Sequence, residues 1–140
     1  MKHIALYLLI TVLSFTANAQ TIVGQWETYD DKTKEKKALI EIYNTGNRYS
    51  AKIIKSFVGE QNAVCKECEG DKKNKPIIGL IIIEDLIQND TEYNGGTILD
   101  PESGEVYSCN LKLINANKLK VRGFIGFSLL GRTQYWRRKL

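Results

Sequence analysis

Turn signals recur at short intervals along this chain, and their spacing constrains the fold more than any other feature. Residues 44–47 read NTGN, a hairpin-type turn, and residues 100–104 read DPESG, with proline where a type I turn accommodates it. The segments between such turns are rich in β-branched and aromatic residues, which is typical of strands. The eight predicted strands cover residues 23–29, 37–43, 48–57, 77–83, 92–99, 105–114, 118–127 and 131–138.

Apolar and polar residues alternate most clearly in the sixth and seventh predicted strands. One face of the sixth contains Tyr107, Cys109, Leu111 and Leu113. In the seventh, Leu119, Val121, Ile125 and Phe127 lie opposite Lys118, Lys120 and Arg122. Alternation with a period of two indicates strands that have one face in a core and the other in water.

Two stretches depart from this regular pattern. Gly95 and Gly96 predict a β-bulge or sharp bend within the fifth strand, and residues 84–88 are a short helix candidate. Eight antiparallel strands in a chain of this length can close into a barrel, which removes the exposed sheet edges. We therefore predict an all-β fold, an eight-stranded antiparallel up-and-down β-barrel. A two-sheet sandwich is the alternative.

The first 19 residues have the pattern of an export signal. A basic start with Lys2 precedes an apolar run at 4–15, and residues 17–19 read ANA, a small-residue cleavage site. The apolar run is shorter than the roughly 20 residues that a membrane span requires, so we expect no stable membrane insertion. Residues 1–19 are predicted to be a cleaved signal peptide and residues 20–140 one domain, exported to the periplasm or the medium.

Cleavage would remove the only histidine, His3, together with Lys2. A mature chain without histidine excludes a serine–histidine–aspartate triad and any histidine-based zinc centre. The net charge would fall from +4 to +3, which does not suggest a nucleic-acid partner. The close acidic pairs, within 30–31 and 100–102, lie in predicted turns and favour turn chemistry. We therefore predict no enzymatic activity, no metal and no cofactor.

Cys65 and Cys68 are three residues apart in a charged loop. A redox pair at this spacing requires a helix N-terminus, and no helix of useful length is predicted to follow. A zinc site built with Cys109 and Glu67 would have an uncommon ligand set. An oxidising compartment favours a disulfide. We predict a Cys65–Cys68 bond with Cys109 buried and free, and a bond between the loop and Cys109 is the alternative pairing.

The first and last predicted strands contain the chain's two tryptophans. Residues 24–26 read GQW, and the last strand ends in Trp136, Arg137 and Arg138. These strands are neighbours in a closed barrel, so a tryptophan from one and an arginine from the other can form a cation–π pair. The G-x-W opening with a late arginine resembles the lipocalin and wider calycin signature. The predicted closing residues are Gly24, Trp26, Trp136, Arg137 and Arg138.

Four sequence blocks extend a resemblance over nearly the whole mature chain. They are GQWETYDD at 24–31, the cysteine loop ending in KPIIGL at 75–80, GGTILDP at 95–101, and LKVRGFIG at 119–126 leading to GRTQYW at 131–136. In this order the blocks resemble the exported bacterial family called domain of unknown function 2147 (DUF2147). The family is regarded as lipocalin-like, so the resemblance implies a lipocalin-like barrel. It implies no catalytic residues, because the family has no established activity.

The interior of an eight-stranded barrel holds either packed side chains or one small ligand. We predict that the mature protein binds a small apolar or amphipathic molecule there. The alternative is a packed barrel that acts as a ligand-free envelope or secreted interaction module. Arg122 alternates with outward lysines, so Arg132 is the better candidate for contact with an anionic head group. The predicted binding residues are Ile40, Ile42, Leu111, Val121, Ile125, Phe127 and Arg132.

Overall fold

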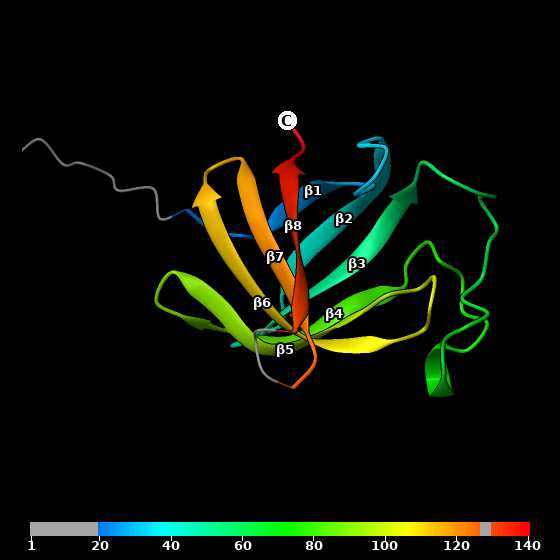
Figure 1. Cartoon of the computed structure of the whole chain (residues 1–140). Coiled ribbons are helices and arrows are strands. Elements are labelled where there is room, and N and C mark those ends of the chain that lie inside the picture. The colour runs from blue at the N-terminus through cyan, green and yellow to red at the C-terminus, as the bar shows by residue number, and fades with distance from the viewer. Residues whose placement is uncertain (1–19, 127–129) are drawn as a thin grey trace, which may run out of the picture.

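The structure is a computed structural model that describes residues 20–126 and 130–140. Each of its eight strands pairs with the next in antiparallel fashion, and β8 pairs with β1 to close a barrel (Figure 1). The predicted up-and-down barrel is therefore confirmed, and the sandwich is excluded. The strands are β1 Gly24–Tyr29, β2 Lys36–Asn44, β3 Tyr49–Ser56, β4 Ile81–Asn89, β5 Glu92–Leu99, β6 Val106–Asn115, β7 Lys118–Phe124 and β8 Gly131–Arg138.

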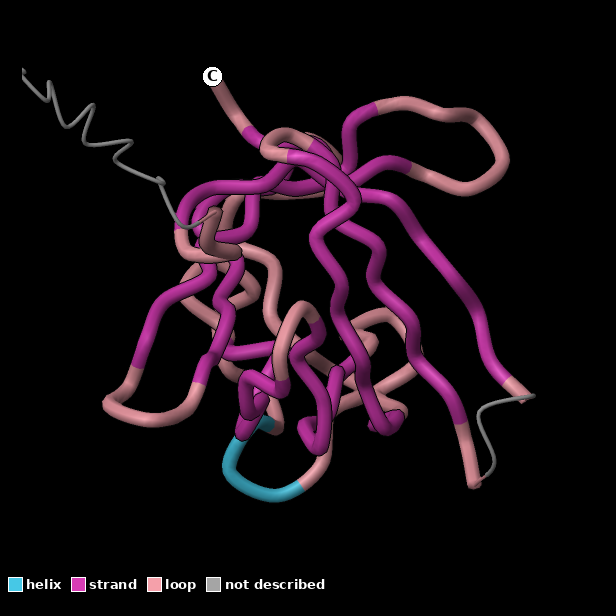
Figure 2. The backbone as a smooth tube through the Cα atoms, turned by 90° about the vertical axis from the view of Figure 1, so that its left-hand side faces the viewer, coloured by secondary structure: helices cyan, strands magenta, loops and turns pink. Residues whose placement is uncertain are grey.

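The connections alternate between the two ends of the barrel, because consecutive strands run in opposite directions. One end, which we call the closed end, has the β2–β3, β4–β5 and β6–β7 turns. The other end, which we call the open end, has the β1–β2 and β5–β6 turns, the end of β7, the start of β8 and the long loop 57–80, which extends beside the β5–β6 turn (Figure 1). Within the described residues, the 3₁₀ turn η1, Gly70–Lys72, is the only helical segment (Figure 2). No helix in this part of the chain is long and apolar enough to cross a membrane.

The fourth strand differs from the prediction, which placed a strand at 77–83 and a helix candidate at 84–88. Strand β4 instead covers Ile81–Asn89, including the whole helix candidate. Asp85 has a φ of 62°, and the pairing with β3 shifts in register between Ile83 and Leu86. Ile83 and Leu86 are both buried although they are three residues apart. Buried residues three apart are typical of one face of a helix, and here a bulged strand produces the same spacing.

The bulge predicted at Gly95 and Gly96 is confirmed. The pairing between β5 and β6 shifts in register between Tyr93 and Gly96. Gly95 has a φ of 76°, and a Cβ atom on Gly96 would overlap the backbone carbonyl of Glu84 on β4. Glycine is therefore required here both by a left-handed backbone conformation and by the close approach of a neighbouring strand.

Apolar side chains fill the closed half of the barrel. Trp26, Ile42, Leu111 and Leu119 expose at most 1% of their surface. Cys109 and Leu111 are buried on the inner face of β6, whereas Ser108 and Lys112 are exposed, as the alternation predicts. The hollow part of the barrel is consequently limited to its open half.

Candidate functional site

A cavity of about 540 Å³ lies at the open end of the barrel. Its apolar wall includes Ile40 from β2, Ile53 from β3, Ile82 from β4, Val121 from β7 and Trp136 from β8. The volume falls within the range of roughly 300–1,000 Å³ that is typical of small-molecule sites. The barrel is therefore packed at one end and hollow at the other.

The predicted apolar binding residues divide into four groups. Ile40 and Val121 line the cavity. Ile42 and Leu111 do not, because they lie closer to the closed end and are packed within the core. Ile125, just after the end of β7, also lines the cavity, but it is 62% exposed and therefore belongs to the rim. Phe127 lies outside the described residues.

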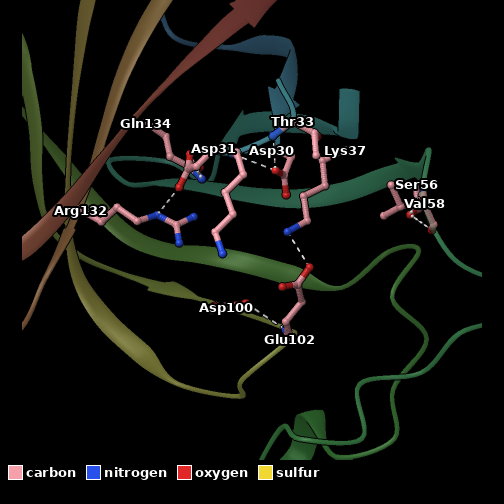
Figure 3. Close-up of polar contacts among 11 residues, drawn as sticks. Asp30, Asp31, Thr33, Lys37, Ser56, Val58, Asp100, Glu102, Arg132 and Gln134 are labelled. Atoms are coloured by element: carbon pink, nitrogen blue, oxygen red, sulfur yellow. Dashed lines mark hydrogen bonds and ion pairs between the residues drawn. The ribbon is translucent and has the colours of Figure 1, made fainter. Parts of the chain in front are cut away.

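Two ion pairs lie at the mouth of the cavity (Figure 3). Lys37 Nζ, at the start of β2, lies 2.5 Å from Glu102 Oε1 in the β5–β6 turn. Arg132 Nε, near the start of β8, lies 2.9 Å from Asp31 Oδ2 in the β1–β2 turn. Lys37, Glu102 and Arg132 also line the cavity. The mouth therefore presents charged groups of both signs above an apolar interior.

Gln134 connects the mouth to the cavity wall. Its Nε2 donates a hydrogen bond to Asp31 Oδ1 at 3.2 Å, and its Oε1 accepts one from Trp136 Nε1 at 3.2 Å. Asp31 is thus held by two side chains, Gln134 and Arg132. Trp136, which was predicted to close the barrel, instead contributes its indole to the cavity wall.

The acidic residues of the two turns stabilise the turns themselves. Asp30 Oδ1 accepts hydrogen bonds from the backbone N–H groups of Lys32 and Thr33, at 2.9 and 2.8 Å. Asp100 Oδ1 accepts one from the N–H of Glu102 at 2.9 Å. The N–H of Thr33, followed by that of Lys32, lowers the pKa of the Asp30 carboxyl below its usual value. A depressed pKa and bonds to turn amides suit a structural carboxylate and not a general acid.

The predicted Cys65–Cys68 disulfide is confirmed, and Cys109 is buried and free as expected. Both disulfide cysteines are buried, with 0% and 1% of their surface exposed. Burial raises the pKa of the Cys109 thiol to about 12. Among residues 20–126 and 130–140, no cluster of three histidine, cysteine or acidic side chains is arranged to hold a metal ion.

The disulfide loop supports one side of the mouth. Gly104, in the β5–β6 turn, has a φ of 75°, and a Cβ atom there would overlap the backbone carbonyl of Glu67. Lys72 Nζ in η1 lies 2.7 Å from Glu84 Oε2 on β4, which ties the same loop to the barrel wall. The loop therefore packs directly against the turn that carries Glu102.

Arg138 covers the closed end of the barrel. Its guanidinium carbon lies 4.3 Å from the centroid of the Trp26 ring. Its nitrogens donate to the backbone carbonyls of Ala116 at 2.7 Å, Val23 at 3.0 Å and Thr21 at 2.6 Å. One side chain thus joins the last strand, the β6–β7 turn and the segment that precedes β1.

The other predicted closing residues have different surroundings. A Cβ atom on Gly24 would lie 2.8 Å from Arg138 Nη1, so this glycine makes room for the guanidinium and not for the indole. Arg137 lies over the ring of Tyr29, with 5.5 Å between the guanidinium carbon and the ring centroid. The contact with Trp26 is therefore made by Arg138 and not by Arg137.

Comparisons with known proteins agree with this architecture. A family model described as "Uncharacterized protein conserved in bacteria (DUF2147)" matches residues 24–138. No curated protein matches the sequence. The structure of HP1028 from Helicobacter pylori, described as belonging to the lipocalin family, is similar with a TM-score of 0.75 and 19% identity, covering 86% of this chain and 84% of that chain. At this identity the likeness supports the fold alone. The chain belongs to the bacterial DUF2147 family and has a lipocalin-like barrel.

Proposed function

We propose that this is an exported, non-catalytic protein that binds a small, largely apolar molecule in its barrel. The cavity of about 540 Å³ carries this proposal, because a mainly apolar wall favours an apolar occupant through the hydrophobic effect. Asp30 and Asp100 use their carboxylates in turns, and Asp31 and Glu102 use theirs in ion pairs. Binding without chemistry therefore fits these side chains better than acid–base catalysis does.

Export is supported by two features of the chain. Residues 1–19 have the pattern of a cleaved signal peptide, although they lie outside the described residues. The Cys65–Cys68 disulfide is of a kind that forms and persists in oxidising compartments such as the periplasm or the extracellular medium.

Native mass spectrometry of the mature protein, purified without detergent from an exporting host, tests the proposal. We expect an additional mass that is lost on denaturation, with the corresponding small molecule in a solvent extract. An Ala38→Phe variant, which places a ring within the cavity lining, should remain folded and lose this mass. A bare polypeptide mass that persists after exposure to a lipid extract would refute the proposal and favour the ligand-free interaction module.

A further inference from the structure

The cavity limits where the polar group of a ligand can lie. Its wall below the mouth is formed mainly by aliphatic side chains, such as Ile40, Ile53 and Val121. A charged group against this wall would lose its hydration without gaining a partner, which is strongly unfavourable. A charged or strongly polar head group must therefore stay at the mouth, within reach of Lys37 and Arg132.

The ion pair between Lys37 and Glu102 is asymmetric in its exposure. The Lys37 side chain is 33% exposed, whereas that of Glu102 is 66% exposed. A ligand that separates the pair leaves one member beside it and returns the other to solvent. Stranding the less exposed charge without a partner costs more, since it recovers less hydration. The more favourable exchange releases Glu102, and the incoming group then replaces its negative charge.

The second ion pair at the mouth is held more firmly. Asp31 forms an ion pair with Arg132 and accepts a hydrogen bond from Gln134, and Gln134 itself accepts one from Trp136. An anion that displaced Asp31 would disrupt this chain of hydrogen bonds. Displacing Glu102 from Lys37 breaks a single ion pair. Lys37 is therefore the cation that is more readily available to a ligand.

We infer that the occupant is an amphiphile with an acidic head group, whose anion replaces Glu102 on Lys37 while its apolar chain fills the cavity. A carboxylate and a phosphate monoester share the chemistry that this exchange requires. The inference rests on the proposed function, because it requires a ligand in the barrel.

Isothermal titration calorimetry with four dodecyl amphiphiles tests the head-group assignment, with the ionic probes below their critical micelle concentrations and dodecanol below its solubility limit. Dodecanoate and dodecyl phosphate are acidic, dodecanol is neutral, and dodecyltrimethylammonium is cationic. The apolar chain of dodecanoate has one methylene fewer than those of the other three, which weakens its binding by about 0.8 kcal/mol. After allowance for the methylene that dodecanoate lacks, we expect the acidic probes to bind about fivefold more tightly than dodecanol, and the cationic probe to bind more weakly than dodecanol. Dodecyl phosphate binding that is more than about fourfold tighter than dodecanoate binding indicates a phosphate head group, because the additional methylene accounts for about that factor; a smaller difference indicates a carboxylate.

Variants of the ion pair give effects of opposite sign. Lys37→Gln should weaken dodecanoate binding by about fivefold more than it weakens dodecanol binding. Glu102→Gln should strengthen dodecanoate binding, because it removes the competing carboxylate. Lys36→Gln is the matched control, since Lys36 is the preceding residue of β2, lies outside the cavity lining and pairs with Glu27 at 3.0 Å. It removes the same charge and should leave all four affinities unchanged.

Equal affinities for dodecanoate and dodecanol, after the allowance for the missing methylene, would overturn the head-group assignment. So would weaker dodecanoate binding by the Glu102→Gln variant, or equal losses of dodecanoate and dodecanol binding by the Lys37→Gln variant. Dodecanol binding that is retained by the Lys37→Gln variant, with a smaller loss than dodecanoate binding, separates a head-group effect from misfolding. If none of the dodecyl compounds binds the wild-type protein, the proposed function itself fails.

Discussion

Replacing Arg138 with methionine should weaken the closed end of the barrel more than any other single change at the surface. Methionine retains an apolar stem but removes the charge and every hydrogen-bond donor. The variant therefore loses the contact with Trp26 and the three hydrogen bonds to the carbonyls of Thr21, Val23 and Ala116.

The magnitude of this loss follows from the contacts. Hydrogen bonds from a charged donor stabilise by roughly 1.5–3 kcal/mol each, and partial exposure of Arg138 reduces this to about 1 kcal/mol each. The cation–π contact adds about 0.5–1 kcal/mol. Because contributions within one cluster do not add fully, we expect a total loss of about 3 kcal/mol. This is a large fraction of the roughly 5–15 kcal/mol that stabilises a typical domain.

Urea unfolding followed by circular dichroism measures this loss. Arg137→Met is the matched control, because it removes the same charge one residue earlier and breaks the longer contact with Tyr29. It should lower the free energy of unfolding by less than about 1 kcal/mol. Arg138→Lys should recover only a minor part of the stability, since an ammonium group cannot reach three separate carbonyls. Equal losses in the two methionine variants would refute the reasoning and reduce the role of Arg138 to its charge.

The remaining predictions concern the cysteines and one turn. Replacing both Cys65 and Cys68 with serine should lower the free energy of unfolding by about 2 kcal/mol, and an unchanged urea midpoint would contradict this. Gly104→Ala should lower the free energy of unfolding by more than about 2 kcal/mol, because the new Cβ atom would overlap the backbone of Glu67. Gly46→Ala is the control and should lower it by about 1 kcal/mol, because the new Cβ atom would meet open space. Similar urea midpoints for the two variants would show that the overlap at Gly104 is relieved. Burial raises the pKa of the Cys109 thiol to about 12. The neutral buried thiol therefore contributes fully to the free energy of unfolding below the pKa of an unfolded cysteine, about 8.5. Above that pH the contribution declines by up to about 1.4 kcal/mol per pH unit. Thermal melts near pH 8 and pH 10 should show a larger loss for the wild type than for Cys109→Ala, and parallel losses would disprove this linkage.

The periodicity of the sequence predicts most of the barrel because alternation and turn chemistry are local properties. Strands β6 and β7 have regular alternation, and their predicted starts lie within one residue of the observed ones. Strand β4 was predicted wrongly because Asp85, with its positive φ, interrupts the alternation. The irregularity accompanies a register shift in the pairing with β3, a long-range contact that the local pattern does not contain.

The candidate site was less predictable, because alternation indicates which side chains point inward but not how deep they lie. Ile40 and Ile42 share the inner face of β2, yet only Ile40 lines the cavity. Depth depends on the tilt of all eight strands and on bulky side chains contributed from elsewhere. Lys37 was missed for a similar reason. It follows Lys36 directly, and only the assembled barrel places one of these lysines at the cavity and the other outside it.

The two tryptophans of the chain lie in different halves of the barrel. Trp26 is covered by Arg138 at the closed end, whereas Trp136 forms part of the cavity wall. Indole fluorescence responds to the immediate surroundings of the ring. A Trp26→Phe variant would therefore emit from the cavity alone, and a Trp136→Phe variant from the closed end alone. The barrel thus contains two intrinsic optical reporters, one for entry of a molecule into the cavity and one for integrity of the closed end.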